Sequence, residues 1–387
     1  MDYLAYMTYP AVIALLLVGM KICKKGEWNS DFLGMQQTKY FQGFLAICIM
    51  LHHIGQEMCA SWQKYLLFPG LNFFVPLGYL FVGLFFLFSG YGLYTSFMQK
   101  PDYLAKGFFK RRALPLLIGY YASAWVFYIA RIIMGQKMSA WESFCYISGI
   151  SLANPYAWFA LTMPLFYLFF YISFKFFKKR QILVVTILVF IYTFIGTCIN
   201  HNEYLMRGQW WYNCVHLFWI GLLIAKYKEK LLEWSKKNYV IKLVACILLF
   251  HAFWTLTQVT QGRFSYYGED AGLPRLITIE YRWICLICEM LCSTAYAFMI
   301  LLAGMKIRIG NKFLGFMGKI TLEFYLIHGL VIELFSYRFC DVVKPIVRIK
   351  FVPLMVLVVT VLSIPLALGF KKICHINLPH KDKEKHD

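Results

Sequence analysis

The chain has 387 residues, of which 60% are hydrophobic, 19% aromatic and only 15% charged, and its mean hydropathy is +0.59. Soluble proteins contain about 45–50% apolar and about 25% charged residues, so this composition excludes a soluble globular protein and an intrinsically disordered one. The net charge of +20 comes from Lys and Arg that lie between apolar blocks, which is typical of membrane topology rather than of nucleic-acid binding. The expected partner is therefore the lipid bilayer and not a nucleic acid.

Apolar blocks close to the ~20 residues that a helix needs to cross a bilayer recur along the whole chain. In chain order they are 4–22, 40–56, 74–96, 113–134, 155–174, 182–199, 209–225, 239–260, 280–304, 320–338 and 351–370. The first block is interpreted as a retained span, because its basic residues follow the apolar run instead of preceding it as in a secretory signal. The sequence predicts an all-α polytopic membrane protein with about 11 transmembrane helices.

The basic residues also predict the orientation of the chain. With the N-terminus outside, the connections on the inner side carry 28 Lys and Arg residues and those on the outer side carry 11. Because Lys and Arg accumulate on the cytoplasmic side, the N-terminus is expected outside and the C-terminus in the cytoplasm. The predicted organisation is an extra transmembrane helix with a cytoplasmic loop at 1–38, a ten-helix membrane domain at 39–370 and a charged cytoplasmic tail at 371–387.

The second block ends in a polar cluster, which begins with the adjacent histidines His52 and His53 and continues to Gln56 and Glu57. Helical spacing places Glu57 one turn beyond His53, so the carboxylate is expected to hold the imidazole in one tautomer and to raise its basicity. This arrangement favours His53 as a general base. The alternative is an interfacial His–Glu pair with no chemical role.

Three further blocks carry polar groups with two possible interpretations each. Tyr325 and His328 share one face of the tenth block, and His328 is interpreted either as a structural histidine that bonds a neighbouring helix or as a catalytic one. Ser89, followed by Gly90, permits close approach of either another helix or a ligand. The basic run 110–112 before the fourth block is suited to phosphates of a soluble donor or to anionic lipid head groups. The cysteine-rich stripe of the ninth block is interpreted as a helix contact, so no metal is expected.

Several short motifs follow one another along the chain: the stretch from Gln42 to His53, the segment Phe85 to Gly90, the basic run Lys110 to Arg112 before Pro115, Trp158-Phe159, Trp211-Tyr212-Asn213, and Tyr325 to His328. In this order they resemble the integral-membrane acyltransferase family 3, whose members transfer acyl groups onto sugars and other surface molecules. The resemblance covers most of the chain after residue 38. His53 takes the position of the family histidine, whereas Gln42 stands where the family usually has arginine and Lys39 lies one turn earlier.

The resemblance implies a membrane-bound, acyl-CoA-dependent O-acyltransferase that moves an acyl group, expected to be acetyl, to a hydroxyl of a cell-surface carbohydrate or related envelope molecule. Acyl-CoA is then a co-substrate, no cofactor is tightly bound, and a bacterial cytoplasmic membrane is the expected location. The implied site residues are His53, Glu57 and His52 for catalysis; Lys39, Gln42, Ser89, Lys110, Arg111 and Arg112 for the donor; and Trp158, Tyr325 and His328 for the acceptor or for support of the catalytic groups.

Two other functions are compatible with the residues. Carboxylates within apolar blocks, at Glu289, Glu323 and Glu333, are compatible with a proton-coupled exporter of a glycan or lipid, although the internal repeat common in transporters is absent from the sequence. The neutral Gln42 is compatible with an inactive relative that serves as a binding protein.

Overall fold

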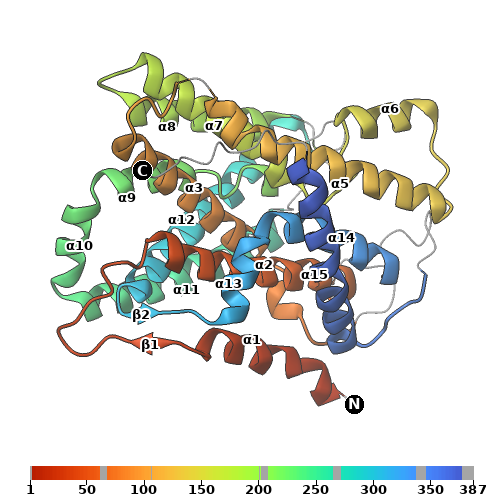
Figure 1. The fold of residues 1–387 in the computed structure, drawn as a ribbon, viewed down its shortest axis with the longest axis horizontal. Coiled ribbons are helices and arrows are strands. Elements are labelled where there is room, and N and C mark those ends of the chain that lie inside the picture. Colours follow the sequence, from red (N-terminus) through yellow and green to blue (C-terminus); the bar gives the residue numbers. More distant parts are fainter. Residues whose placement is uncertain are drawn as a thin grey trace, which may run out of the picture.

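The structure is a computed structural model, and it describes residues 2–61, 68–105, 107–199, 201, 208–264, 272–336 and 346–376. Within these ranges the chain is helical apart from one small sheet and its connections (Figure 1). The elements are η1 (Asp2–Met7), α1 (Thr8–Leu17), β1 (Lys21–Ile22), α2 (Met35–Met58), η2 (Asn72–Phe74), α3 (Gly78–Gln99), α4 (Phe108–Arg112), α5 (Leu114–Ile133), α6 (Ala140–Ser148), α7 (Trp158–Phe176), α8 (Gln181–Cys198), η3 (Gln209–Trp211), α9 (Leu217–Lys226), α10 (Lys228–Lys236), α11 (Tyr239–Arg263), α12 (Arg275–Gly304), β2 (Ile307–Arg308), α13 (Lys312–Lys319), α14 (Thr321–Phe335) and α15 (Val352–Ile376).

Every predicted apolar block contains a helix, but the helices differ in their ability to cross a bilayer. Within the described parts of the chain, seven helices are long and apolar enough to cross a bilayer, namely α3, α5, α7, α8, α11, α12 and α15. Helices α13 and α14 are together long and apolar enough for one span, and the chain bends by 85° at the break between them. The all-helical membrane class is therefore confirmed. The number of 11 spans and the orientation stay predictions.

The remaining blocks explain why the number of clear spans is lower than predicted. The apolar helices Tyr3–Leu17 and Leu217–Lys226 are shorter than a full span, although both belong to apolar blocks. Helix α2 has 24 residues, which is long enough, but its glutamines and histidines lower its hydropathy. A helix with polar groups is stable in a membrane when other helices cover it, and α2 is buried over most of its length.

The segment before α2 is fixed to the rest of the protein at one end of the bundle. β1 pairs antiparallel with β2, with Lys21 opposite Arg308. The Asn311 side chain donates hydrogen bonds to the carbonyls of Leu15 and Val18, at 3.0 and 3.1 Å. Figure 1 shows this small sheet and α10 at one end of the molecule, and α6 and the N-terminus at the other. The basic residues of β1, of α10 and of the segment at β2 thus lie at the same end of the molecule.

Small residues allow two of the central helices to pack closely. A Cβ atom on Gly90 of α3 would lie 2.0 Å from the Phe218 carbonyl oxygen, and one on Gly221 of α9 would lie 2.1 Å from the Leu87 carbonyl oxygen. Both distances are far below van der Waals contact, so only glycine fits at these positions. The glycine after Ser89 therefore serves a helix contact, which was one of its two interpretations.

The end of the chain extends α15 further than the sequence suggests. The predicted tail starts at residue 371, whereas α15 continues to Ile376. The rest of that tail, 377–387, lies outside the described residues.

Candidate active site

Two histidines from distant parts of the chain meet at the centre of the candidate site. His53 lies near the end of α2 and His328 in the middle of α14, and they are 9% and 0% exposed. His53 Nδ1 is 2.8 Å from His328 Nε2. The rings are stacked with centroids 5.1 Å apart and planes at 9°. Packing between α2 and α14 thus holds the two imidazoles in a fixed relation.

The hydrogen bonds around this pair assign the protons on both rings. His328 Nδ1 is 3.0 Å from the Phe324 carbonyl oxygen, which only accepts, so Nδ1 of His328 carries its proton. In neutral His328, Nε2 is then an acceptor, and His53 Nδ1 donates to it. A neutral His53 protonated on Nδ1 has its lone pair on Nε2. The arrangement therefore makes His53 Nε2 the basic atom of the pair.

Tyr156 packs against both histidines, and sequence reasoning did not find it. Its ring centroid is 4.9 Å from that of His53 and 6.0 Å from that of His328. A Cβ atom on Gly329 would lie 2.1 Å from Tyr156 Cδ2, so the glycine after His328 leaves the space for this ring. In the sequence Tyr156 stands two residues before Trp158, at the start of the predicted block 155–174, and nothing there set it apart from the other aromatic residues of that block.

Asn154 holds the Tyr156 segment in place. Its side-chain amide donates to the Leu326 carbonyl of α14 at 2.8 Å and to the Ser123 hydroxyl of α5 at 3.1 Å. Its side-chain oxygen accepts from the Tyr156 N–H at 3.1 Å. Asn154 is 0% exposed, and a buried amide with partners on three segments fixes their relative positions.

Tyr325 lies beside His328, with ring centroids 6.2 Å apart, and Trp158 lies at the start of α7, next to Phe159. The Phe159 N–H at the start of α7 donates to the Tyr325 hydroxyl at 3.3 Å. The rings of Trp158 and Phe159 lie 6.1 and 5.0 Å from that of Phe86 on α3. Helices α3, α7 and α14 therefore meet at an aromatic layer that contains two of the three predicted supporting residues, with the third, His328, one turn away from Tyr325.

His52 and Glu57 have different surroundings from those that the sequence suggested. His52 Nδ1 is 3.0 Å from the Phe74 carbonyl oxygen, and its ring lies against Gly78, where a Cβ would be 2.2 Å from His52 Nε2. Glu57 is buried, with 8% exposure, one turn beyond His53. The group that holds Nδ1 of His53 is nevertheless His328 and not Glu57. A catalytic role for His52 and an orienting role for Glu57 stay predictions.

Two of the predicted donor residues, Ser89 and Arg112, lie close to the same side chain. Arg112 Nε donates to the Tyr103 hydroxyl at 2.9 Å, and Arg111 Nη2 donates to the Tyr103 carbonyl at 3.3 Å. Tyr167 of α7 lies close enough to both Ser89 and Arg112 to interact with them. The predicted serine and the predicted basic run, 23 residues apart in sequence, are thus neighbours of one tyrosine.

The remaining donor candidates lie elsewhere on the surface of this region. Lys39 is exposed, and its backbone carbonyl packs against α13, where a Cβ on Gly318 would be 2.2 Å away. Gln42 is half-buried one turn later in α2, and Lys110 is exposed on α4. Their role in donor binding stays a prediction. Within the described ranges, no group of three His, Cys, Asp or Glu residues is arranged to hold a metal ion.

A buried ion pair connects α5 with α14 near the histidines. Arg131 donates two hydrogen bonds to the Glu333 carboxylate, at 3.1 Å from Nε and 2.8 Å from Nη2, and both side chains are at most 5% exposed. Glu333 is five residues after His328, which is about 7.5 Å along the helix. Glu333 was considered above as a carboxylate for proton-coupled export, and the structure instead gives it a basic partner that fixes α14.

Comparison with known protein families identifies the family of this chain. The family model described as an acyltransferase domain, Acyltransferase 3, matches residues 38–370. The chain belongs to this family. The resemblance drawn from its motifs is therefore confirmed, and the protein is a membrane acyltransferase. No curated protein and no solved structure matches the chain significantly.

Proposed function

We propose that this acyltransferase moves an acyl group, acetyl in the simplest case, from acyl-CoA to a hydroxyl of a cell-surface carbohydrate or related envelope molecule, with His53 as general base. The observation that carries the proposal is the chain of hydrogen bonds from His53 through His328 to the Phe324 carbonyl. It orients one basic nitrogen in a buried place, and an oriented imidazole is the commonest general base in enzymes.

In the proposed reaction, His53 Nε2 takes the proton of the acceptor hydroxyl while the hydroxyl oxygen attacks the thioester carbonyl. The C–S bond then breaks, and the leaving CoA thiolate takes the proton back from His53. While His53 is charged, its Nδ1–H bond to His328 becomes a hydrogen bond from a cation, which is stronger than that of the neutral ring. A two-step route through an acyl-histidine uses the same nitrogen as the nucleophile.

The donor is proposed to enter from the end at which the basic run lies. Arg111 and Arg112 would bind CoA phosphates, since arginine forks match phosphate oxygens. Ser89 is one turn beyond Phe85 on α3, and Tyr167 is eight residues, about 12 Å, beyond Phe159 on α7. The aromatic layer at Phe159 therefore lies between the Ser89–Tyr167 contact and the histidines, and a thioester extended past Ser89 would approach His53 through it.

The acceptor is proposed to bind at the outer end of α2. From Gln42 to His53 the helix rises about 16 Å, roughly half of a hydrocarbon core of about 30 Å. His53 is thus deep enough in the membrane to meet a donor from the cytoplasm and an acceptor from outside. A bacterial cytoplasmic membrane fits this division, because the acyl-CoA pool is inside and the envelope carbohydrates are outside.

The experiment is transfer of radiolabelled acetyl-CoA to a bacterial envelope extract by the purified protein in nanodiscs. Three proteins are compared: wild type, His53→Ala and the control His251→Ala, which removes an exposed histidine whose ring bonds the carbonyl of Ile247 in its own helix. We expect transfer with wild type and His251→Ala and its loss with His53→Ala, each variant remaining monodisperse.

Transfer at the wild-type rate by His53→Ala would remove His53 from the mechanism. No transfer and no binding of acetyl- or longer acyl-CoA by wild type would reject the acyl-CoA donor. Substrate movement that depends on a pH gradient, without acyl-CoA consumption, would instead favour export.

A further inference from the structure

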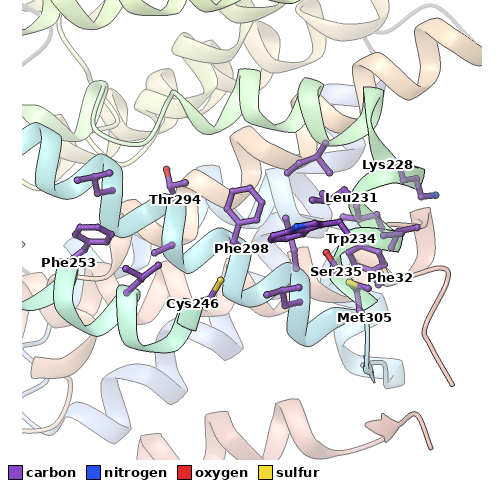
Figure 2. Close-up of a pocket in the computed structure, with 18 residues that line it drawn as sticks. Phe32, Lys228, Leu231, Trp234, Ser235, Cys246, Phe253, Thr294, Phe298 and Met305 are labelled. Carbon is purple, nitrogen blue, oxygen red and sulfur yellow. The ribbon is translucent and has the colours of Figure 1, made fainter. Parts of the chain in front are cut away.

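A cavity of about 310 Å³ lies among α9, α10, α11 and α12. Figure 2 shows the side chains that line it. Most of them are aliphatic or aromatic, and the few polar ones include Lys228, Ser235 and Thr294. The volume is at the lower end of the range for ligand pockets, and an apolar lining selects an apolar ligand or part of one. Neither the proposed donor residues nor the histidines contribute to it.

The cavity is long and follows a membrane-spanning helix. Its lining runs from Leu291 of α12 to Met305, the residue that ends this helix, which is 14 residues or about 21 Å along the axis. Figure 2 shows Phe253 and Thr294 at one end, Phe298 in the middle, and Lys228 and Met305 at the other. Half of a hydrocarbon core is about 15 Å thick, so one leaflet's acyl chain has a similar length and direction. A compact ligand would leave much of this slot empty.

The slot is accessible from the bilayer through α11. Only 6% of the apolar stretch of this helix is buried inside the protein, so most of its surface is exposed to lipid. Leu249, which lines the slot, is 48% exposed, and its neighbour Leu248 is 65% exposed and does not line it. A lipid chain can therefore enter sideways from the membrane without passing through the protein.

One end of the slot is basic and the other is not. Lys228 lines it and is half-buried, and the same short helix and its end carry Lys230, Lys236 and Lys237 against Glu229 and Glu233, which leaves an excess of positive charge. Trp234 of this helix is 57% exposed, as is typical of tryptophan at the level of the lipid head groups. At the opposite end the Thr294 hydroxyl already bonds His216 Nε2 at 2.9 Å. The polar part of a ligand therefore belongs at the α10 end.

Part of the wall comes from the segment before the family domain. Phe32 and Leu33 line the cavity, and they precede residue 38, where the family match begins. The Asn29 side chain holds this segment by donating to the carbonyls of Gly304 and Ile307, at 3.0 and 3.1 Å. The extra N-terminal segment thus completes the slot.

We propose that this slot binds one acyl chain of an anionic phospholipid, with its phosphate head group at Lys228. The slot supplies the length and apolar surface for a chain, and α10 supplies the positive charge for the head group. The lipid would bind between the N-terminal segment and α10 and hold the two together. The proposal does not depend on the acyl donor or on His53.

Native mass spectrometry of the delipidated full chain, titrated with dioleoyl phosphatidylglycerol or dioleoyl phosphatidylcholine, tests the site. Leu249→Trp is expected to fill the slot and to weaken binding of phosphatidylglycerol at least tenfold, whereas the matched control Leu248→Trp binds as wild type. Lys228→Gln is expected to weaken phosphatidylglycerol about fivefold and to leave phosphatidylcholine unchanged, and Lys230→Gln to have little effect.

Three results would overturn the proposal. Wild-type binding by a folded Leu249→Trp would show that lipid binds elsewhere. Equal affinity of wild type for both lipids, unaltered by Lys228→Gln, would exclude the head-group contact. Displacement of phosphatidylglycerol by palmitoyl-CoA, one for one, would assign the slot to a thioester instead of a phospholipid.

Discussion

The hydrogen bond between His53 and His328 permits a quantitative prediction. His328→Phe keeps a planar ring on α14 but removes the acceptor at 2.8 Å from His53 Nδ1. When His53 is protonated during transfer, this hydrogen bond has a charged donor, and such bonds contribute about 1.5–3 kcal/mol. Their loss in the transition state lowers kcat by about ten- to a hundredfold. Loss of the base itself in His53→Ala is expected to cost about 10²- to 10⁴-fold.

The assay is the initial rate of radiolabelled acetyl transfer at saturating acetyl-CoA, with KM for the donor measured separately. His328→Phe is expected to lower kcat and to leave KM for acetyl-CoA nearly unchanged, because His328 lies beyond the aromatic layer from the proposed donor residues. His328→Gln offers a side-chain oxygen to His53 and should recover part of the rate. A folded His328→Phe protein with the kcat of wild type would refute the role of His328 in orienting His53.

Three other predictions test packing and charge. Gly329→Ala brings a Cβ to within 2.1 Å of the Tyr156 ring, so we expect a loss of about 1–3 kcal/mol in stability and lower transfer activity, measured by thermal unfolding and initial rates. Arg131→Ala and Glu333→Ala should each destabilise the protein by about 3–5 kcal/mol, and the double replacement by Met and Leu by much less; equal losses would argue against a buried ion pair. In α6, outside the spans, hydrogen bonds from the N-cap backbone and hydroxyl lower the pKa of Glu142. Because a lowered pKa favours the folded state above the unfolded pKa, this support is lost as the pH falls through the folded pKa, and amide exchange in α6 should accelerate there in wild type but not in Glu142→Gln.

Local patterns in the sequence predicted the elements of the fold well. Each apolar block contains a helix, since an apolar run of this length satisfies its backbone only as a helix in lipid. The number of clear spans was less predictable. Whether α2 lies in the membrane depends on the helices that cover its histidines and glutamines, and a hydropathy window contains no information about such neighbours.

The candidate site was predicted residue by residue but not as an arrangement. The sequence indicated His53 and His328 separately, because ionisable groups are rare in apolar blocks. Helical spacing offered Glu57 as the partner of His53, since only neighbours within one helix can be read from spacing. The partner at Nδ1 is instead His328, 275 residues away, and it is brought there by the packing of α14 against α2.

The sequence by itself thus determined the class of this protein, its helices and the polar residues within its apolar blocks, which are costly in a membrane. Composition and periodicity are properties of a few turns of one helix, and such local patterns are enough to predict the protein class, the helices and their polar residues. Only the tertiary structure decided that His328 orients His53, that Tyr156 covers both rings beside Gly329, and that Arg131 pairs with Glu333. Each of these contacts joins segments from different helices, so the close packing of the bundle, and no local rule, brings them together.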